Sequence, residues 1–249
     1  MRRFKLVVAY DGTDFHGWQS QPGQRTVQGV LEAALQALVG DDWVQVDGAG
    51  RTDRGVHARG QVASFSAATR LPARALMPAL NSRLPADLRV RASEEVPVRF
   101  HARLTARARR YSYQLLPEED LLYRRMAWFP RRSLPLAGLA RATRALERAD
   151  DFSAFRAAGS GEGSPLCRVM RASWTAHGPF LRFDIVADRF LYHMVRNIVG
   201  TALKVAAAPD PAAAMDSIVA SRDRRRAGVT APAQGLCLEQ VFYPEGPTS

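Results

Sequence analysis

The chain carries, at positions 48–58, the stretch Gly48-Ala49-Gly50-Arg51-Thr52-Asp53-Arg54-Gly55-Val56-His57-Ala58, between two segments with strand patterns at residues 43–46 and 61–65. Its glycines let the backbone turn sharply or approach a ligand closely. A glycine-rich loop can cradle phosphate, but the Lys-Ser/Thr ending of a P-loop is absent and no helix pattern begins there. We therefore expect a specialised loop that does not bind nucleoside triphosphates.

Asp53 is the residue in this loop best suited to chemistry. It lies between Arg51 and Arg54, and nearby positive charge favours the ionised form of a carboxyl group. An ionised carboxylate acts as a nucleophile or a base, not as an acid. The alternative is a structural aspartate, because aspartates in glycine-rich turns commonly hydrogen-bond their own backbone. His57 is expected to be structural.

The segments around this loop mix strands and helices. Strands are expected at residues 4–10, 43–46, 61–65 and 88–96, and helices at residues 27–39 and 73–84. Thr26 is the predicted N-cap of the first helix, and Gly40 ends it. Phe15 and Trp18 are expected in the core, although either aromatic ring could stack on a base. The order lacks the regular crossover units of a parallel sheet and indicates an α+β fold.

The remainder of the chain has a similar inventory. Strands are expected at residues 111–115, 169–176, 181–186 and 235–243, and helices at residues 136–147, 189–206 and 210–220. Tyr111 would by default be a core aromatic of its strand. Arg196 lies beside the apolar stripe of the helix at 189–206; it could be a surface arginine or reach into a cleft. We expect two domains, residues 1–104 and 105–249.

The charge of the chain indicates a polyanionic partner. The 249 residues carry a formal net charge of +11 and a sequence pI near 10.7, a balance that favours phosphate backbones over small neutral substrates. Four arginine clusters are candidate phosphate contacts, and the alternative for each is a solvated surface: Arg107/Arg109/Arg110, Arg124/Arg125, Arg131/Arg132 and Arg222/Arg224/Arg225/Arg226. Nucleic acid is the first candidate partner.

The two cysteines, Cys167 and Cys237, are far apart and belong to no CxxC or Cys/His cluster. Neither a zinc site nor a disulfide framework is indicated. No apolar run approaches the roughly 20 residues that span a bilayer, and the first ten residues alternate like a strand instead of resembling a signal peptide. A cytoplasmic location is expected.

Six motifs, in this order along the chain, carry a family resemblance: Tyr10-Asp11-Gly12-Thr13-x-Phe15-x-Gly17-Trp18-Gln19, Arg51-Thr52-Asp53-x-Gly55-Val56-His57-Ala58, Arg110-Tyr111-x-Tyr113, Asp151-Phe152-Ser153-x-Phe155, Phe190-Leu191-Tyr192-His193-Met194-Val195-Arg196 and Gly235-Leu236-x-Leu238. Together they resemble the bacterial TruA-type tRNA pseudouridine synthases over essentially the whole chain. Any one motif could arise by chance, but all six in this order are highly specific.

The resemblance implies a role for each site residue. Asp53 would attack the target nucleoside, at the sugar or at the base, so that uracil detaches, rotates and rejoins through carbon. Tyr111 would stack on the base and relay a proton, and Arg196 would pair with Asp53. Arg51 would support the flipped-out base, and Leu236 or Leu238 would form the apolar wall beneath it.

The resemblance also implies two related halves, each an antiparallel sheet backed by helices, with the active site in the cleft between them. It implies a homodimer, a tRNA substrate modified in the anticodon stem-loop at positions 38–40, and no metal or cofactor. The chain departs from many relatives at residues 160–166, where a cysteine-containing segment is replaced by Ser160-Gly161-Glu162-Gly163-Ser164-Pro165-Leu166, and at Asp150, which stands where a histidine is common.

Two other functions remain open from the residues. A non-catalytic RNA-binding module or chaperone of the same fold would bind tRNA with a steep salt dependence and leave uridine unchanged. A nucleotide-binding phosphotransferase would use the glycine-rich loop, and the absent P-loop lysine argues against it.

Overall fold

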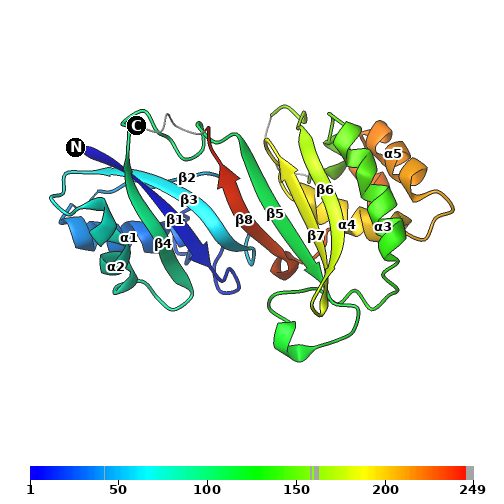
Figure 1. The fold of residues 1–249 in the computed structure, drawn as a ribbon, viewed down its shortest axis with the longest axis horizontal. Coiled ribbons are helices and arrows are strands. Elements are labelled where there is room, and N and C mark those ends of the chain that lie inside the picture. Colours follow the sequence, from blue (N-terminus) through cyan, green and yellow to red (C-terminus); the bar gives the residue numbers. More distant parts are fainter. Residues whose placement is uncertain (42, 158, 160–162, 245–249) are drawn as a thin grey trace. The chain divides into compact units, whose positions relative to one another are not determined.

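The computed structural model describes residues 1–41, 43–157, 159 and 163–244 (Figure 1). The chain forms two compact units. Unit 1 comprises Met1–Arg107 and the chain from Leu238 onward, and unit 2 comprises Ala108–Cys237. Each unit is described by itself.

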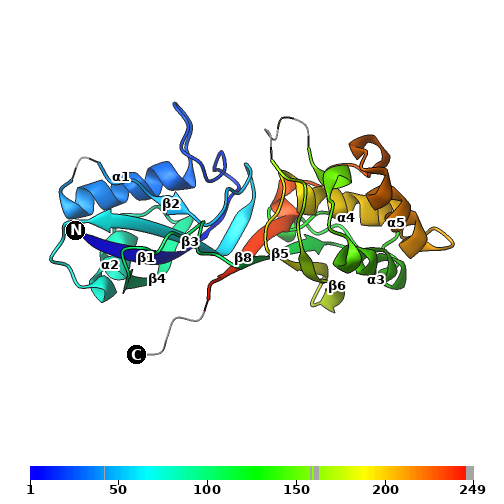
Figure 2. The ribbon, with the colours of Figure 1, turned by 90° about the horizontal axis from the view of Figure 1, so that it is seen from above.

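Unit 1 is an antiparallel sheet with two helices. Its strands lie in the order β4-β1-β3-β8, and β2 pairs with β3. Figure 2 shows α1 running alongside the strands. The elements are β1 (Arg2–Tyr10), α1 (Val27–Val39), β2 (Asp47–Gly48), β3 (His57–Ala67), α2 (Ala73–Asn81), β4 (Leu88–Val96) and β8 (Leu236–Phe242), which begins in unit 2.

The alternation of β1 explains how unit 1 forms its core. Phe4, Leu6 and Val8 point to one face and are fully buried, and the ring of Phe4 stacks on Phe65 of β3 at 5.3 Å between centroids. Burying such side chains contributes roughly 1.5–3 kcal/mol each. The expected caps of α1 are confirmed: Thr26 accepts a hydrogen bond from the Gly29 amide, and Gly40 takes the left-handed conformation.

Unit 2 contains the antiparallel strands β5, β7 and β6, which are neighbours in that order. Its three helices pack on one another beside β6 (Figure 1). Its buried aromatic rings include Phe152, Phe155 and Phe183. The elements are β5 (Ala108–Leu115), α3 (Leu136–Arg144), β6 (Val169–His177), β7 (Phe180–Ala187), α4 (Met194–Val205) and α5 (Pro211–Ser221), with 3-10 turns at Leu121–Tyr123, Ala145–Arg148, Ser153–Phe155, Arg224–Arg226 and Ala233–Gly235.

One expected helix begins later than predicted, and one expected strand is absent from residues 43–46. The helix expected at residues 189–206 begins only at Met194, because His193 takes a left-handed conformation (φ 60°) that an α-helix cannot continue. The strand expected at residues 43–46 is absent from the described part of that segment, and β2 begins at Asp47. There the Val46 amide donates to the Glu32 side chain of α1, not to a neighbouring strand, and Trp43 is 79% exposed.

The α+β class is confirmed, and the other expected strands and helices are present within a few residues of their expected ends. The expected division at residue 104 places the whole of the last strand in the second domain. In the structure, β8 from Leu238 onward belongs to unit 1, where it lies beside β3. In the part of the chain that the structure describes, no helix is long and apolar enough to cross a bilayer. Residues 160–162 of the divergent segment lie outside the described residues.

Candidate active site

The Asp53 loop connects β2 to β3 and is tied to β3 at its start. The Ala49 amide donates to the Val62 carbonyl at 2.8 Å, and the buried Gln61 side chain donates to the Gly50 carbonyl at 2.8 Å. Buried backbone groups that find partners in this way make a loop as well determined as a strand. The start of the glycine-rich segment is therefore fixed against β3.

A second loop, residues 11–18, packs directly on the Asp53 loop. The Trp18 amide donates to the Thr52 carbonyl at 3.0 Å, and the Gly55 amide donates to the Phe15 carbonyl at 3.4 Å. Gly17 has φ of 86°, and a Cβ at this position would lie 2.7 Å from the Thr52 carbonyl oxygen. Only glycine combines that backbone conformation with so close an approach.

The backbone around Asp53 is held on both sides. Thr52 is buried, and its hydroxyl lies 2.7 Å from the Tyr10 hydroxyl at the end of β1. On the other side, the Val56 amide donates to the Asp53 carbonyl at 3.1 Å, and Gly55 takes a positive φ of 78°. Asp53 itself is half-buried, at the edge between buried Thr52 and exposed Arg54. These contacts fix the backbone on both sides of Asp53.

The other predicted residues of the two loops differ in burial. Arg51 is exposed, as is Arg54. His57 is buried; its Nδ1 accepts from the Gly12 amide at 3.0 Å and lies 3.1 Å from the Asp11 carboxylate. Phe15 and Trp18 are 1% and 2% exposed, which confirms the expected core placement and leaves neither ring accessible to a base.

In unit 2, Tyr111 lies on β5 opposite Ile185 of β7 and is buried. Its ring meets the edge of Phe190, with centroids 5.0 Å apart and ring planes at 82°. Phe190 belongs to the segment just before α4, so this contact joins two of the motifs found in the sequence.

Arg196 lies in the first turn of α4 and is half-buried. Its Nε donates to the Ala231 carbonyl at 2.7 Å, and the Ala231 amide donates to the Arg196 carbonyl at 3.2 Å. The reciprocal bonds fix both the backbone and the guanidinium plane. The segment around Ala231 was not singled out by the sequence, although Gly228 and Gly235 beside it were a signal of close backbone packing.

Tyr113 connects the same segment to β5. It is fully buried, and its hydroxyl donates to the Pro232 carbonyl at 2.7 Å. Burial raises the pKa of this phenol, and the nearby charge of Arg196 only partly opposes the shift. Tyr113 is thus protonated at neutral pH and acts as a structural hydrogen-bond donor. A Cβ on Gly235 would lie 2.5 Å from its ring.

Leu236 and Leu238 lie two positions apart on β8 and are both buried, at 6% and 0% exposed. Tyr111, Arg196 and Leu236 belong to unit 2, whereas Asp53, Arg51 and Leu238 belong to unit 1. An active site that combines them remains a prediction.

The two cysteines lack the exposure of a reactive thiol. Both Cys167 and Cys237 are buried and free. Burial raises the pKa of the Cys167 thiol to about 11, so the thiol stays protonated at neutral pH. Among the described residues, no group of three or more His, Cys, Asp or Glu side chains is placed to hold a metal ion.

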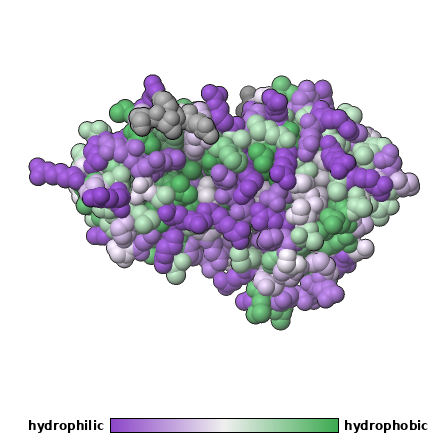
Figure 3. All heavy atoms as spheres, viewed as in Figure 1, coloured by the Kyte–Doolittle hydropathy of each residue, from purple (hydrophilic) through white to green (hydrophobic). Residues whose placement is uncertain are grey.

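The arginine clusters differ in how their side chains are used. Arg124, Arg125, Arg131 and Arg132 are exposed on the connection between β5 and α3, which also carries Leu121 and Leu122 at 70% and 86% exposed. This connection forms the hydrophobic tip at the lower edge of Figure 3. In the last cluster, Arg225 pairs with Asp223, Arg222 pairs with Asp151, and Arg224 turns inward.

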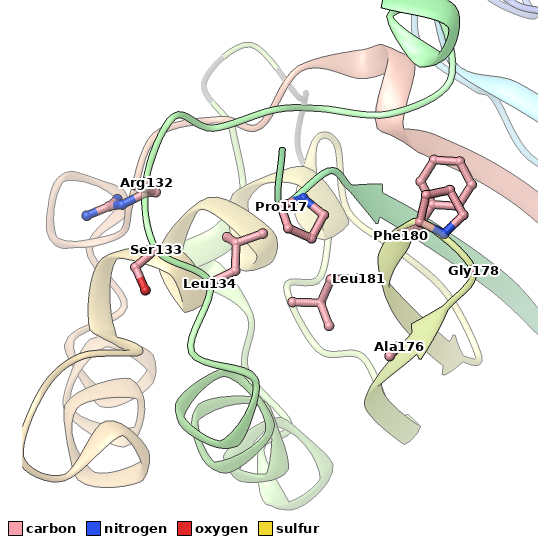
Figure 4. A pocket seen from close by; sticks show the side chains of 9 residues that line it. Pro117, Arg132, Ser133, Leu134, Ala176, Gly178, Phe180 and Leu181 are labelled. Carbon is pink, nitrogen blue, oxygen red and sulfur yellow. The ribbon is translucent and has the colours of Figure 1, made fainter. Parts of the chain in front are cut away.

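A small cavity of about 280 Å³ lies between the same connection and the β6–β7 hairpin. Figure 4 shows Pro117, Leu134 and Leu181 among the side chains that line it. None of the expected site residues lines this cavity, and apart from Arg132 its lining offers no ionisable side chain. Its position does not make it a candidate active site.

Comparison with known proteins identifies close relatives. The family described as tRNA pseudouridine synthase matches residues 6–104 and 142–244. A protein of Moorella thermoacetica named tRNA pseudouridine synthase A is 45% identical over 243 residues, which cover 96% of this chain and 98% of the relative. Proteins of the same name from Geobacter sp. (strain M21) and Geobacillus kaustophilus are each 41% identical over 98% of this chain, and the matches cover 100% and 95% of those relatives.

The packing of Gly17 leads to a prediction with a matched control. Gly17→Ala and Gly23→Ala both place a side chain at positive φ, which costs roughly 1–2 kcal/mol, but a Cβ added at Gly23 would meet no atom within 4 Å. We expect Gly17→Ala to lose about 1–3 kcal/mol more, because the overlap with the Thr52 carbonyl forces the backbone to move. Urea unfolding measures both, and equal losses would contradict the packing described.

Proposed function

The chain belongs to the bacterial TruA-type tRNA pseudouridine synthases, isomerases that convert uridine to pseudouridine in tRNA, and we propose that it modifies the anticodon stem-loop at positions 38–40 with Asp53 as the catalytic carboxylate. The observation that supports this role is the loop itself. A half-buried carboxylate on a backbone tied down on both sides suits a nucleophile, because its position need not be found anew at each turnover.

The proposed reaction balances without an oxidant or reductant. The Asp53 carboxylate bonds to the ribose or to the uracil ring, and the N1–C1′ bond breaks. The uracil turns, C5 bonds to C1′, the bond to Asp53 breaks and restores the carboxylate, the C5 proton is released, and N1 ends protonated. The release of one proton from C5 per turnover gives the reaction a direct readout.

The residues of unit 2 would supply the surroundings of the reacting base. Tyr111 is proposed to stack on the base and relay a proton, and Arg196 to pair with the Asp53 carboxylate. Arg51 is proposed to support the flipped-out nucleotide, with Leu236 or Leu238 as the apolar wall beneath the base. Such a site requires Asp53 of unit 1 to meet Tyr111 and Arg196 of unit 2, in a cleft between the two units.

The energy of base flipping explains why a strongly basic chain suits this reaction. Extruding a base costs a few kcal/mol, and stacking on one aromatic ring returns about 1–3 kcal/mol. Tyr111 alone therefore roughly balances the cost. The exposed arginines of the β5–α3 connection are proposed to provide the remaining contacts to phosphates, with tRNA recognised mainly by shape.

We further propose that the enzyme is a cytoplasmic homodimer in which one tRNA contacts both subunits. This part of the proposal rests on the family resemblance. Sedimentation velocity of the full chain tests it, and a monomer at working concentrations would contradict it.

The catalytic assignment is tested with Asp53→Asn. The change keeps the size of the side chain and removes the nucleophile, so we expect tRNA affinity within a few-fold of wild type and no measurable turnover. Release of tritium from tRNA labelled at C5 of uridine measures turnover. Asp41→Asn, just after the end of α1, is the matched control and keeps full activity. Turnover by Asp53→Asn would place the chemistry on another residue.

The same assay separates the enzyme from a non-catalytic tRNA-binding protein, since wild-type chain that binds tRNA but releases no tritium would be such a module. Mapping pseudouridine in the product tRNA tests the target site. We expect modification at positions 38–40, and products modified only elsewhere would contradict the anticodon assignment while leaving the activity intact.

The role of the Tyr111 hydroxyl is tested with Tyr111→Phe. The ring contact with Phe190 survives this change, so folding and tRNA binding are expected to be close to wild type. Loss of the proton relay is expected to lower the rate by about 100-fold or more. Single-turnover tritium release measures the rate, and a wild-type rate would limit Tyr111 to stacking.

A further inference from the structure

The chain between the 3-10 turn at Arg224–Arg226 and β8 lies tightly against one face of α4. The Gly228 amide donates to the Thr201 hydroxyl at 2.8 Å, and that hydroxyl donates to the Asn197 carbonyl at 2.6 Å. A Cβ on Gly200 would lie 1.8 Å from the Val229 carbonyl oxygen. No side chain fits between Gly200 and Val229, so the position of one segment determines the position of the other.

Asn197 is the centre of this contact and is fully buried. Its Nδ2 donates to the Phe155 carbonyl at 2.8 Å. Its Oδ1 accepts two hydrogen bonds, from Arg224 Nη2 at 2.9 Å and from the Thr230 hydroxyl at 2.7 Å. Every polar atom of a buried amide needs such partners, because an unsatisfied one costs about 1–3 kcal/mol.

Arg224 closes the network from outside. Its Nη1 donates to the Gly228 carbonyl at 2.9 Å, and its Nη2 donates to the Thr230 hydroxyl at 3.0 Å as well as to Asn197. The planar fork of a guanidinium can reach three acceptors in this way, whereas an ammonium group cannot hold the same geometry. Its neighbour Arg225 instead pairs with Asp223 on the surface, with 90% of its side chain exposed.

The two residues next to this network are the pair that orients the guanidinium of the α4 arginine. Arg196 precedes Asn197, and Ala231 follows Thr230. Arg224 is therefore hydrogen-bonded to the residue next to each partner of the bond from Arg196 Nε to the Ala231 carbonyl. A shift of the segment away from α4 moves the Ala231 carbonyl and turns the Arg196 guanidinium with it.

We infer that Arg224 is a positioning residue for the isomerisation: through Asn197 and Thr230 it holds the segment that orients Arg196. The inference rests on the proposed function of Arg196. Arg224 then differs from the other arginines of the 222–226 cluster. Its guanidinium, predicted from the sequence as a phosphate contact, donates instead to three acceptors within the protein. A displacement near 1 Å at a catalytic group can cost 100-fold in rate.

The test compares Arg224→Met, Arg224→Lys and Thr230→Val by single-turnover tritium release with enzyme in excess over tRNA. When folded enzyme saturates the tRNA, the rate constant measured in this way does not depend on the fraction of enzyme that is folded. We expect Arg224→Met and Arg224→Lys to be about 10- to 100-fold slower, with tRNA affinity and its salt dependence unchanged. Thr230→Val is expected to be slowed several-fold, and it carries the test if the Arg224 variants do not fold.

Arg148→Met is the control for loss of one positive charge, because Arg148 is exposed and makes only a long ion pair of 3.5 Å with Asp216 among the contacts described. It keeps the wild-type rate. A wild-type rate for Arg224→Lys together with a weaker salt dependence for Arg224→Met would overturn the proposal and make Arg224 a phosphate contact.

Coupling to Arg196 distinguishes positioning from general stability. If Arg224 acts through Arg196, adding Arg224→Met to Arg196→Lys slows the reaction by much less than it slows the wild type. Multiplicative effects of the two changes would contradict the inference. Wild-type enzyme that releases no tritium would instead refute the proposed function, so the two failures are distinguishable.

Discussion

The close approach of two loop backbones in unit 1 is the constraint on which the candidate site depends. Gly17, at positive φ, lies against the Thr52 carbonyl, and the Trp18 amide donates to the same oxygen. The residue after Thr52 is Asp53, so this hydrogen bond fixes the backbone from which the Asp53 side chain extends. The motif with Gly17 and buried Trp18 therefore positions the motif with Thr52 and Asp53, which lies 35 residues further along the chain.

Unit 2 holds Arg196 by the same physical means. Arg196 sits on a helix turn that is bonded reciprocally to Ala231, and the segment around Ala231 passes so close to α4 that glycines are required at Gly200 and Gly228. In both units a backbone segment without regular structure is fixed by buried hydrogen bonds to a second segment. Hydrogen bonds of this kind are costly to break without replacement, which makes the two loops rigid although neither is a helix or strand.

The sequence predicted most strands and helices because their signals are local. The alternation of β1, the Thr26 cap and the Gly40 stop each act within a few residues. The helix of Arg196 was predicted too long because the apolar spacing of Phe190 and Leu191 continues the stripe, although the two residues lie in irregular chain before the turn at 192–193. A left-handed His193 has no signal in a single sequence, since most non-glycine residues avoid that conformation.

The sequence by itself determined the α+β class, the six motifs and hence the family, the excess of positive charge, and Asp53 as the residue in an unusual glycine-rich loop. These follow from residue types and short spacings. The tertiary structure alone decided that Arg224 is used internally while Arg225 stays on the surface, and that β8 from Leu238 joins unit 1. The physical reason is that such outcomes depend on which distant carbonyls and side chains meet, and no local pattern encodes a partner 27 residues away.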